Sequence, residues 1–209
     1  MRIRLFIALV LMTGSAHAAT LCAPDEQALW QCPIAKNHKM ASLCASKDVS
    51  ATQGYVQYRY GTPGKVELTY PATRAPAPQS FHYDAGFNGD GEYVSVQFTN
   101  AGNDYSLFNQ DGSDNDRTGT ASISVKTANG KTGDLDCRYD ANNRLTSMED
   151  IVGGTYTEKG SAVDHTITDY APGKKVKKVT TMEGQPDGTV KTSITYPNGK
   201  TETHTEKLP

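Results

Sequence analysis

The chain has 209 residues and a formal net charge of −2 at pH 7. A nearly neutral, slightly acidic protein lacks the basic surface of a nucleic-acid-binding protein, so we expect no nucleic-acid partner. Beyond the N-terminal segment, no stretch approaches the roughly 18 consecutive apolar residues of a transmembrane helix, so we expect no membrane span.

Residues 1–18 have the features of a secretory signal peptide. Arg2 and Arg4 form a basic start, an apolar run of about eight residues follows, and Ala16-His17-Ala18 is a small-x-small cleavage motif. Cleavage would start the mature chain at Ala19 and, by removing two arginines, change the net charge from −2 to −4. We therefore predict a soluble protein that is periplasmic or secreted.

All four cysteines follow this segment: Cys22, Cys32, Cys44 and Cys137. In an oxidising compartment an even number of cysteines predicts two disulfides, and four cysteines permit three pairings. Cys22 can pair with Cys32, leaving Cys44 for Cys137; alternatively Cys32 pairs with Cys44, leaving Cys22 for Cys137. Either way Cys137 closes a loop of about 90 residues or more, which is worth roughly 4 kcal/mol in the chain-entropy treatment. The spacings contain no C-x-x-C pair, so we expect neither a zinc site nor a catalytic thiol.

Apolar residues alternate with polar ones along most of the chain, which indicates β-strands. No window shows the apolar spacing of a helix, and only 24–28 is compatible with a single helical turn. The sequence predicts an all-β fold, an antiparallel β-sandwich or barrel stapled by two disulfides, with a polar β-hairpin C-terminal tail. The expected strands lie at 29–34, 40–45, 54–60, 65–70, 80–83, 92–99, 103–109, 121–126 and 134–139.

A composition shift near residue 150 divides the chain. We predict a signal peptide at 1–18, a disulfide-stapled β domain at 19–150 and a polar, repeat-like β-hairpin extension at 151–209. In the extension a Tyr-x-x-Gly-Lys-type turn recurs with an offset of 26, at Tyr170 and at Tyr196. This indicates either stacked hairpins or a chance similarity of turns. With so few apolar residues, the extension either adds strands to the domain or stays partly disordered.

Three motifs occur in order: Cys22-x9-Cys32, Ser42-Leu-Cys-Ala-Ser46, and Gly54-Tyr-Val-Gln-Tyr-Arg-Tyr-Gly61. With the later Gly-x-Gly-Glu-Tyr-Val-Ser-Val-Gln-Phe stretch at 89–98, they resemble a family of small exported bacterial proteins that has no assigned activity. The resemblance covers roughly residues 20–138. It implies an exported, β-rich domain and no particular chemistry.

The sequence predicts no catalytic residue, no cofactor and no metal site. Ser80 and His82 lack the orienting carboxylate and oxyanion hole of a nucleophilic centre. Glu67 is interpreted as a solvated carboxylate rather than one of a glycosidase pair. The acidic loop 111–116 offers calcium ligands but departs from the EF-hand pattern at its sixth and twelfth positions, so a solvated loop is favoured and calcium binding stays open.

The remaining candidate is a protein-binding surface. Tyr55, Gln57 and Arg59 share one face of a predicted strand, and Tyr and Arg are prominent at protein interfaces. Tyr58, Tyr60 and Tyr70 are interpreted as core aromatics. We predict a non-enzymatic protein-binding module of the bacterial envelope whose partner is an envelope protein such as a cell-wall hydrolase. The alternatives are an inhibitor or immunity-type partner of such a hydrolase, a cell-wall or polysaccharide hydrolase itself, and a structural component with an unprotected sheet edge in its tail. The oligomeric state stays open.

Overall fold

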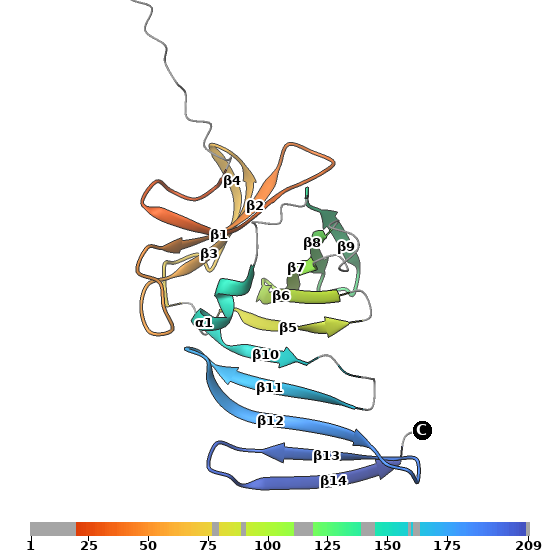
Figure 1. Ribbon diagram of the computed structural model, residues 1–209. Helices are drawn as coiled ribbons and strands as arrows, with labels where there is room; N and C mark the ends of the chain where they lie inside the picture. The colour runs from red at the N-terminus through yellow and green to blue at the C-terminus, as the bar shows by residue number, and fades with distance from the viewer. Residues whose placement is uncertain are drawn as a thin grey trace, which may run out of the picture.

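The computed structural model describes residues 20–76, 80–88, 91–110, 119–138, 145–158, 160 and 164–207. These residues form a nearly all-β protein with two sheets (Figure 1). The four-stranded sheet has the order β1-β2-β3-β4, with β1 Glu26–Pro33, β2 Met40–Ser46, β3 Val56–Thr62 and β4 Lys65–Tyr70. The predicted signal peptide and the acidic loop 111–116 lie outside the described residues.

The second sheet has ten strands in the order β14-β13-β12-β11-β10-β5-β6-β7-β8-β9. Its strands are β5 His82–Asn88, β6 Gly91–Asn100, β7 Asn103–Gln110, β8 Thr120–Lys126, β9 Thr132–Asp136, β10 Gly154–Thr157, β11 His165–Ala171, β12 Lys175–Gly184, β13 Thr189–Thr195 and β14 Thr201–Lys207. Neighbouring strands are antiparallel except β5 and β10, which are parallel.

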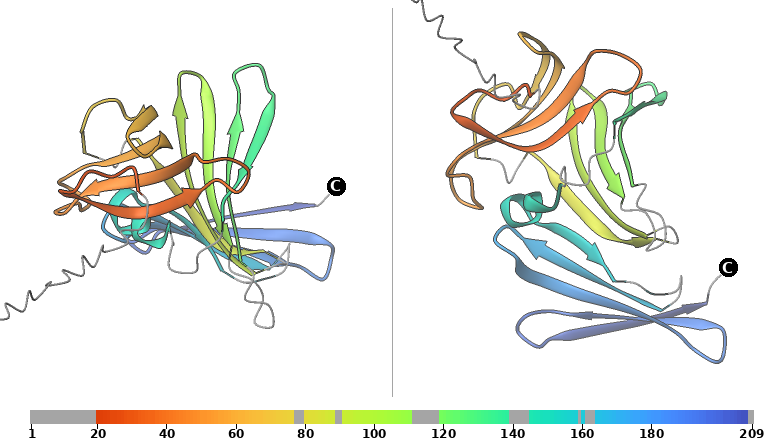
Figure 2. Two further views of the ribbon diagram at one scale, coloured as in Figure 1. Left: turned by 90° about the horizontal axis from the view of Figure 1, so that it is seen from above. Right: turned by 45° about the horizontal axis from the view of Figure 1, so that its top comes forward.

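The four-stranded sheet packs against one part of the ten-stranded sheet, so the predicted all-β sandwich is confirmed. The core draws its residues from β1–β3, from β5–β8 and from a short helix, and the blue strands β11–β14 extend away from this sandwich (Figure 2). Burial of apolar side chains between the two sheets is the main source of stability in such a fold. The molecule is therefore a two-layer sandwich continued by a single-layer sheet.

The alternation of core-facing and outward-facing side chains along β3 gives the four-stranded sheet its core face. Val56 and Tyr58 are buried against the facing sheet, where the Tyr58 ring lies 5.0 Å from that of Phe98. Phe98 also stacks on Tyr105 of its own sheet, with ring centroids 4.7 Å apart. The sheets are joined by a polar contact as well, because the Trp30 indole N–H donates a 2.8 Å hydrogen bond to Asn109 Oδ1. The aromatic cluster fixes how the two layers face each other.

The disulfides join Cys22 to Cys44 and Cys32 to Cys137. This is the third possible pairing and differs from both arrangements considered from the sequence. Cys44 pairs in register with Gln57 on the outer face of the four-stranded sheet, where the N-terminal segment passes, whereas Cys32 belongs to the core beside Cys137. The expected long loop is confirmed, since Cys137 bonds to a cysteine 105 residues earlier.

One helical segment was not predicted. A 3-10 turn, η2 (Leu145–Ser147), leads into helix α1 (Met148–Val152). Leu145, Met148, Ile151 and Val152 are all buried. Their spacing is that of one face of a helix, but it extends over only two turns, which is a weak signal in a sequence. The segment 24–28, the one place where the sequence was compatible with a helical turn, does not form one, because β1 already begins at Glu26. The short helix connects the stapled sandwich to β10.

The C-terminal segment adds strands to the large sheet. Gly154 to Thr157 of β10 pairs in parallel with Tyr83 to Gly86 of β5, and β11–β14 follow as antiparallel hairpins. The two turns that recur in the sequence join β11 to β12 and β13 to β14, and the turn between β12 and β13 separates them. Among the alternatives for this segment, the described residues therefore show added strands, and the large sheet runs without a break past residue 150.

The described part of the chain contains no helix that is both long and apolar enough to cross a membrane.

Candidate functional site

The residues predicted to bind a partner come together, but two of the three are buried and Tyr55 is half-buried. Tyr55 precedes β3, and Gln57 and Arg59 lie in it, on the face turned away from the core. Gln57 is 4% exposed and Arg59 is 9% exposed, so their predicted place on an open surface is wrong. The reason is that the N-terminal segment crosses this face: the Leu21 carbonyl accepts a 3.0 Å hydrogen bond from Arg59 Nη1.

These side chains surround one carboxylate, that of Glu26, whose side chain has no solvent exposure. Arg59 binds it through its two terminal guanidinium nitrogens, Nη1 at 2.6 Å and Nη2 at 2.7 Å. The Tyr55 hydroxyl donates at 2.8 Å, the Ala23 N–H at 2.7 Å and Arg74 Nη2 at 3.1 Å. Five hydrogen bonds thus converge on the two carboxylate oxygens.

The pKa of Glu26 reflects this environment. Burial alone raises the pKa of a carboxyl, but the hydrogen bonds from Arg59, the Ala23 N–H and Tyr55 outweigh it and lower the pKa from 4.5 to about 2. Glu26 is therefore ionised at neutral pH. A general acid requires the opposite shift, so the geometry makes Glu26 a structural anion that holds the N-terminal segment to the sheet.

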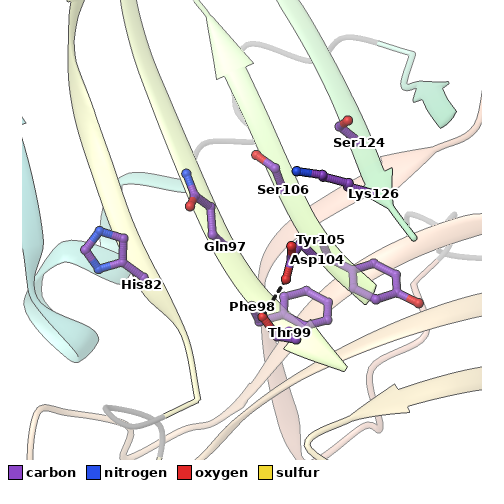
Figure 3. Close-up of a pocket in the computed structure, with 9 residues that line it drawn as sticks. All are labelled: His82, Gln97, Phe98, Thr99, Asp104, Tyr105, Ser106, Ser124 and Lys126. Carbon is purple, nitrogen blue, oxygen red and sulfur yellow. Dashed lines mark hydrogen bonds between the residues drawn. The ribbon is translucent and has the colours of Figure 1, made fainter. Parts of the chain in front are cut away.

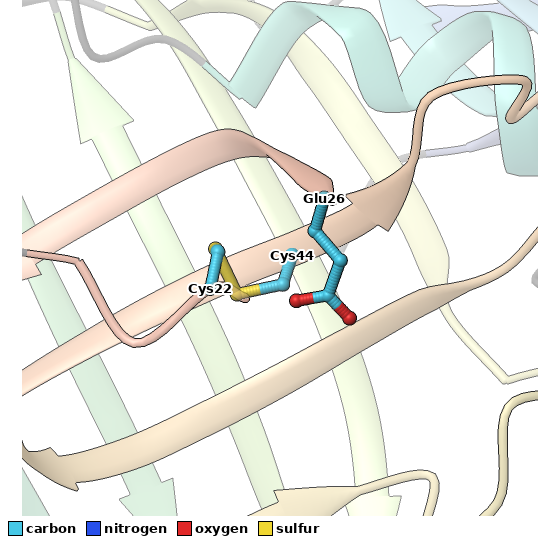
Figure 4. Close-up of side chains that lie close together, drawn as sticks. All are labelled: Cys22, Glu26 and Cys44. Atoms are coloured by element: carbon cyan, nitrogen blue, oxygen red, sulfur yellow. A yellow bond between two sulfur atoms is a disulfide. The ribbon is translucent and has the colours of Figure 1, made fainter. Parts of the chain in front are cut away.

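Glu26 also lies within ligand distance of Cys22 and Cys44 (Figure 4). The two sulfur atoms are bonded to each other at 2.03 Å, and a disulfide lacks the thiolates that a soft metal binds. The carboxylate is already occupied by its five donors. This group of three side chains fastens the N-terminal segment rather than holding a metal.

A polar groove crosses the other sheet (Figure 3). It has a volume of about 360 Å³ and lies over β5–β8. Its lining residues are His82, Gln97, Phe98, Thr99, Asp104, Tyr105, Ser106, Ser124 and Lys126. Four of them form a straight row across four adjacent strands, because the register pairs His82 with Gln97, Gln97 with Ser106, and Ser106 with Ser124.

Part of the groove is ordered by its own hydrogen bonds. The hydroxyls of Ser95 and Ser106 lie 3.1 Å apart, and Gln97 Nε2 donates to Ser95 Oγ at 3.3 Å. At the end of the groove Thr99 donates to Asp104 Oδ1 at 2.8 Å. His82 is exposed, and it also lines a second cavity of about 210 Å³.

A third candidate site is the edge strand β14, at the end of the ten-stranded sheet. β14 pairs with β13 on one side and ends the strand order on the other, and all seven of its residues are exposed. A strand in this position presents backbone N–H and C=O groups that a further strand can use. The unprotected edge named above as the mark of a structural component is therefore present in the tail.

None of the known family models matches the chain, and no significant similarity is found to a curated protein or to a solved structure. The resemblance based on the cysteine and Gly-Tyr-Val-Gln-Tyr-Arg-Tyr-Gly motifs consequently stays a prediction.

The groove was missed by the sequence analysis although a signal for it exists. Gln97 and Thr99 alternate with buried residues on β6, and Ser124 and Lys126 alternate with the buried Ile123 and the partly buried Val125 on β8. Each pattern looks like an ordinary solvent-facing strand. Only the register between strands aligns these positions into one row, and register is set by turns and by contacts with the opposite sheet.

Proposed function

We propose that the protein is an exported, non-enzymatic protein-binding module of the bacterial envelope that binds an extended segment of its partner along β14. The observation that carries this proposal is the fully exposed edge strand of a sheet that continues beyond the sandwich. Strand addition at such an edge supplies main-chain hydrogen bonds for affinity, while alternate side chains decide which partner is accepted.

The side chains of β14 favour a basic partner strand. Glu202, His204 and Glu206 lie on one face, and three threonines and Lys207 lie on the other. A neighbouring strand with Lys or Arg at alternate positions would place a cation opposite each glutamate, and each such cross-strand pair is worth roughly 0.2–1 kcal/mol.

A second copy of the chain is a poorer occupant of the same edge. In an antiparallel pair centred on His204, Glu202 of each copy would face Glu206 of the other. Two like-charged pairs on one face oppose association. The charge pattern therefore favours a different, basic chain, and we take the partner to be an envelope protein such as a cell-wall hydrolase.

Export is supported by two observations of different kinds. Both disulfides are formed, and disulfides are typical of oxidising compartments outside the cytoplasm. The first 18 residues have the sequence of a signal peptide. A cell-wall hydrolase activity of the chain itself would require two carboxylates across a cleft, and the described lining of the groove contributes one, Asp104.

The proposal is tested with an eight-residue peptide of alternating Lys and Thr and its Glu-Thr counterpart. We expect the mature oxidised protein to bind the basic peptide alone, with new hydrogen-exchange protection in residues 201–207. Charge reversal at the edge, Glu202→Lys with Glu206→Lys, should weaken binding by about tenfold or more. No binding of the basic peptide, or protection outside β14, would contradict the proposal.

The matched control reverses two carboxylates on the opposite edge strand, Asp134→Lys with Asp136→Lys of β9. This variant has the same net charge as the β14 variant and should bind the basic peptide as the native protein does. Equal losses of affinity for the basic peptide in both variants would show that the effect comes from the overall charge and not from β14. An envelope protein that is retained by the native protein and the β9 variant, and lost by the β14 variant, identifies the natural partner.

A further inference from the structure

The groove over β5–β8 presents two short rows of hydrogen-bonding side chains. The first row runs from His82 through Gln97 and Ser106 to Ser124, and the second joins Thr99, Asp104 and Lys126. Adjacent strands are about 4.8 Å apart, so the first row extends roughly 14 Å across the sheet. The groove therefore fits an elongated ligand better than a compact one.

The chemistry of the lining selects a neutral polar ligand. Gln97, Ser106 and Ser124 offer both donors and acceptors and carry no charge. One carboxylate, from Asp104, and one ammonium, from Lys126, balance each other. A polyanion would find a single lysine here, and an apolar ligand would bury hydroxyl and amide groups without partners, which is costly. A polyol satisfies these groups.

The groove is partly preorganised for such a ligand. Ser95, which is 5% exposed and lies two residues before Gln97 on the same face of β6, interacts with both Gln97 and Ser106, and the Thr99 hydroxyl holds Asp104. Side chains that are held before binding lose less conformational entropy when the ligand arrives. The rings of Phe98 and Tyr105 alternate with these polar residues and pack on the core face of the sheet, so the groove presents its polar rows on the opposite face.

The second cavity extends the same surface. It is lined by His82 together with Asp169, Tyr170 and Lys177, among others, and so continues from β5 toward β11 and β12. We propose that this groove is a binding site for a neutral oligosaccharide, with successive sugar rings lying across successive strands. The site goes beyond the partner-binding edge, because it lies on other strands and requires a different ligand.

The test uses the mature oxidised protein and three probes: the β-1,4-linked tetramers of N-acetylglucosamine and of glucose, and the α-1,4-linked tetramer of glucose. Titration calorimetry and amide chemical shifts should show binding of at least one probe, with shifts at Gln97, Ser106 and Ser124. Gln97→Ala should weaken that binding by about tenfold. The matched control, Gln27→Ala, changes an exposed glutamine on β1 and should leave the affinity unchanged.

Lys126→Met distinguishes a neutral ligand from an anionic one. For a neutral oligosaccharide it should change the affinity by less than about threefold. The proposal is overturned if none of the three tetramers binds, if Gln97→Ala binds as the native protein does, or if Lys126→Met abolishes binding while Gln97→Ala does not. Because each of these variants leaves β14 intact, failure here would be separate from failure of the partner-binding proposal.

Discussion

The Glu26 carboxylate lies on the outer face of the four-stranded sheet with its side chain fully covered, and donors from four other residues reach it. Arg59 supplies the two short bonds in a bidentate geometry that Lys cannot reproduce. Gln57 extends the network, accepting from Arg59 at 2.8 Å and donating to the Pro71 carbonyl at 2.9 Å. The N-terminal segment, β3 and the residues after β4 are therefore joined through the Glu26 carboxylate and its ion pairs with Arg59 and Arg74.

Glu26→Gln should destabilise the protein by about 3–5 kcal/mol. The substitution leaves the Arg59 guanidinium buried without a counter-ion, and an uncompensated buried charge costs far more than the ion pair contributes. The measurement is the free energy of unfolding from urea titration at neutral pH. A loss below 1 kcal/mol would contradict the structural role assigned to the pair.

The control for this variant is Glu67→Gln. Glu67 pairs with Lys39 at 2.6 Å, but both side chains are more than a third exposed. Pairs of this kind contribute about 0–1 kcal/mol because solvent screens them. The same chemical change at Glu67 should therefore lower the free energy of unfolding by at most about 1 kcal/mol.

The pKa of Glu26 predicts a pH dependence with a definite sign. The folded value of about 2 lies below the unfolded value of 4.5, so the ionised form stabilises the folded state above about pH 5. This contribution, about 3 kcal/mol, is lost as the pH falls from there to about 2. The stability difference between the native protein and Glu26→Gln should shrink by about that amount, measured by urea unfolding at neutral pH and near pH 2.5. An unchanged difference would refute the assignment.

At the scale of elements, the joint between the sandwich and the added strands is the parallel pair β5–β10. Gly154 faces Tyr83 there so closely that a Cβ at this position would collide with the Tyr83 carbonyl oxygen. The clash is with backbone, so a side chain cannot be accommodated by a rotamer change. Thr155 adds a hydrogen bond from its hydroxyl to the Asp84 carboxylate across the same pair. Attachment of β11–β14 to the rest of the sheet therefore requires glycine at position 154.

Gly154→Ala should separate β10 from β5 and lower stability by about 2 kcal/mol through overpacking. Hydrogen exchange should speed up in residues 154–157 and 165–171 and change least in β2 and β3. Gly133→Ala on β9 is the matched control, because a Cβ there meets no atom within 4 Å. Equal exchange in the two variants would show that the tight approach at Gly154 does not hold the joint.

At the scale of the whole molecule, Cys32–Cys137 ties β1 of the smaller sheet to the segment after β9 of the larger one. The same junction is reinforced by backbone hydrogen bonds from Ala35 to Asp136, at 2.8 Å, and from Arg138 to Pro33, at 2.8 Å. One side of the sandwich is thus closed covalently, while the side of β10 remains continuous with the added strands.

Removing the two disulfides separately should have unequal effects. In the chain-entropy treatment the bridge that spans 105 residues is worth about 5 kcal/mol and the one that spans 22 about 3 kcal/mol. Cys32→Ala with Cys137→Ala should therefore destabilise the protein more than Cys22→Ala with Cys44→Ala. Thermal and urea unfolding of the two double variants measure the difference, and the reverse order would contradict it.

The strands of the sandwich and its fold class could be predicted because alternation and turn residues are local signals. Hairpin β3–β4, with its Thr-Pro-Gly turn, is an example. The parallel pairing of β10 with β5 could not be predicted, since it joins segments about 70 residues apart and depends on the close approach at Gly154. The surface position expected for Arg59 is wrong for a similar reason: its cover, the segment at Leu21, is placed by the Cys22–Cys44 bond.

The closure by Cys32–Cys137 has a mechanical consequence. A load transmitted through a ligand strand on β14 first meets hairpins β13–β14 and β11–β12, which contain no disulfide and can unzip one after another. The covalent bond shortens the load path between residues 32 and 137, so pulling cannot stretch the enclosed segment. The added strands would yield as an extensible tether while the sandwich at its base kept its shape.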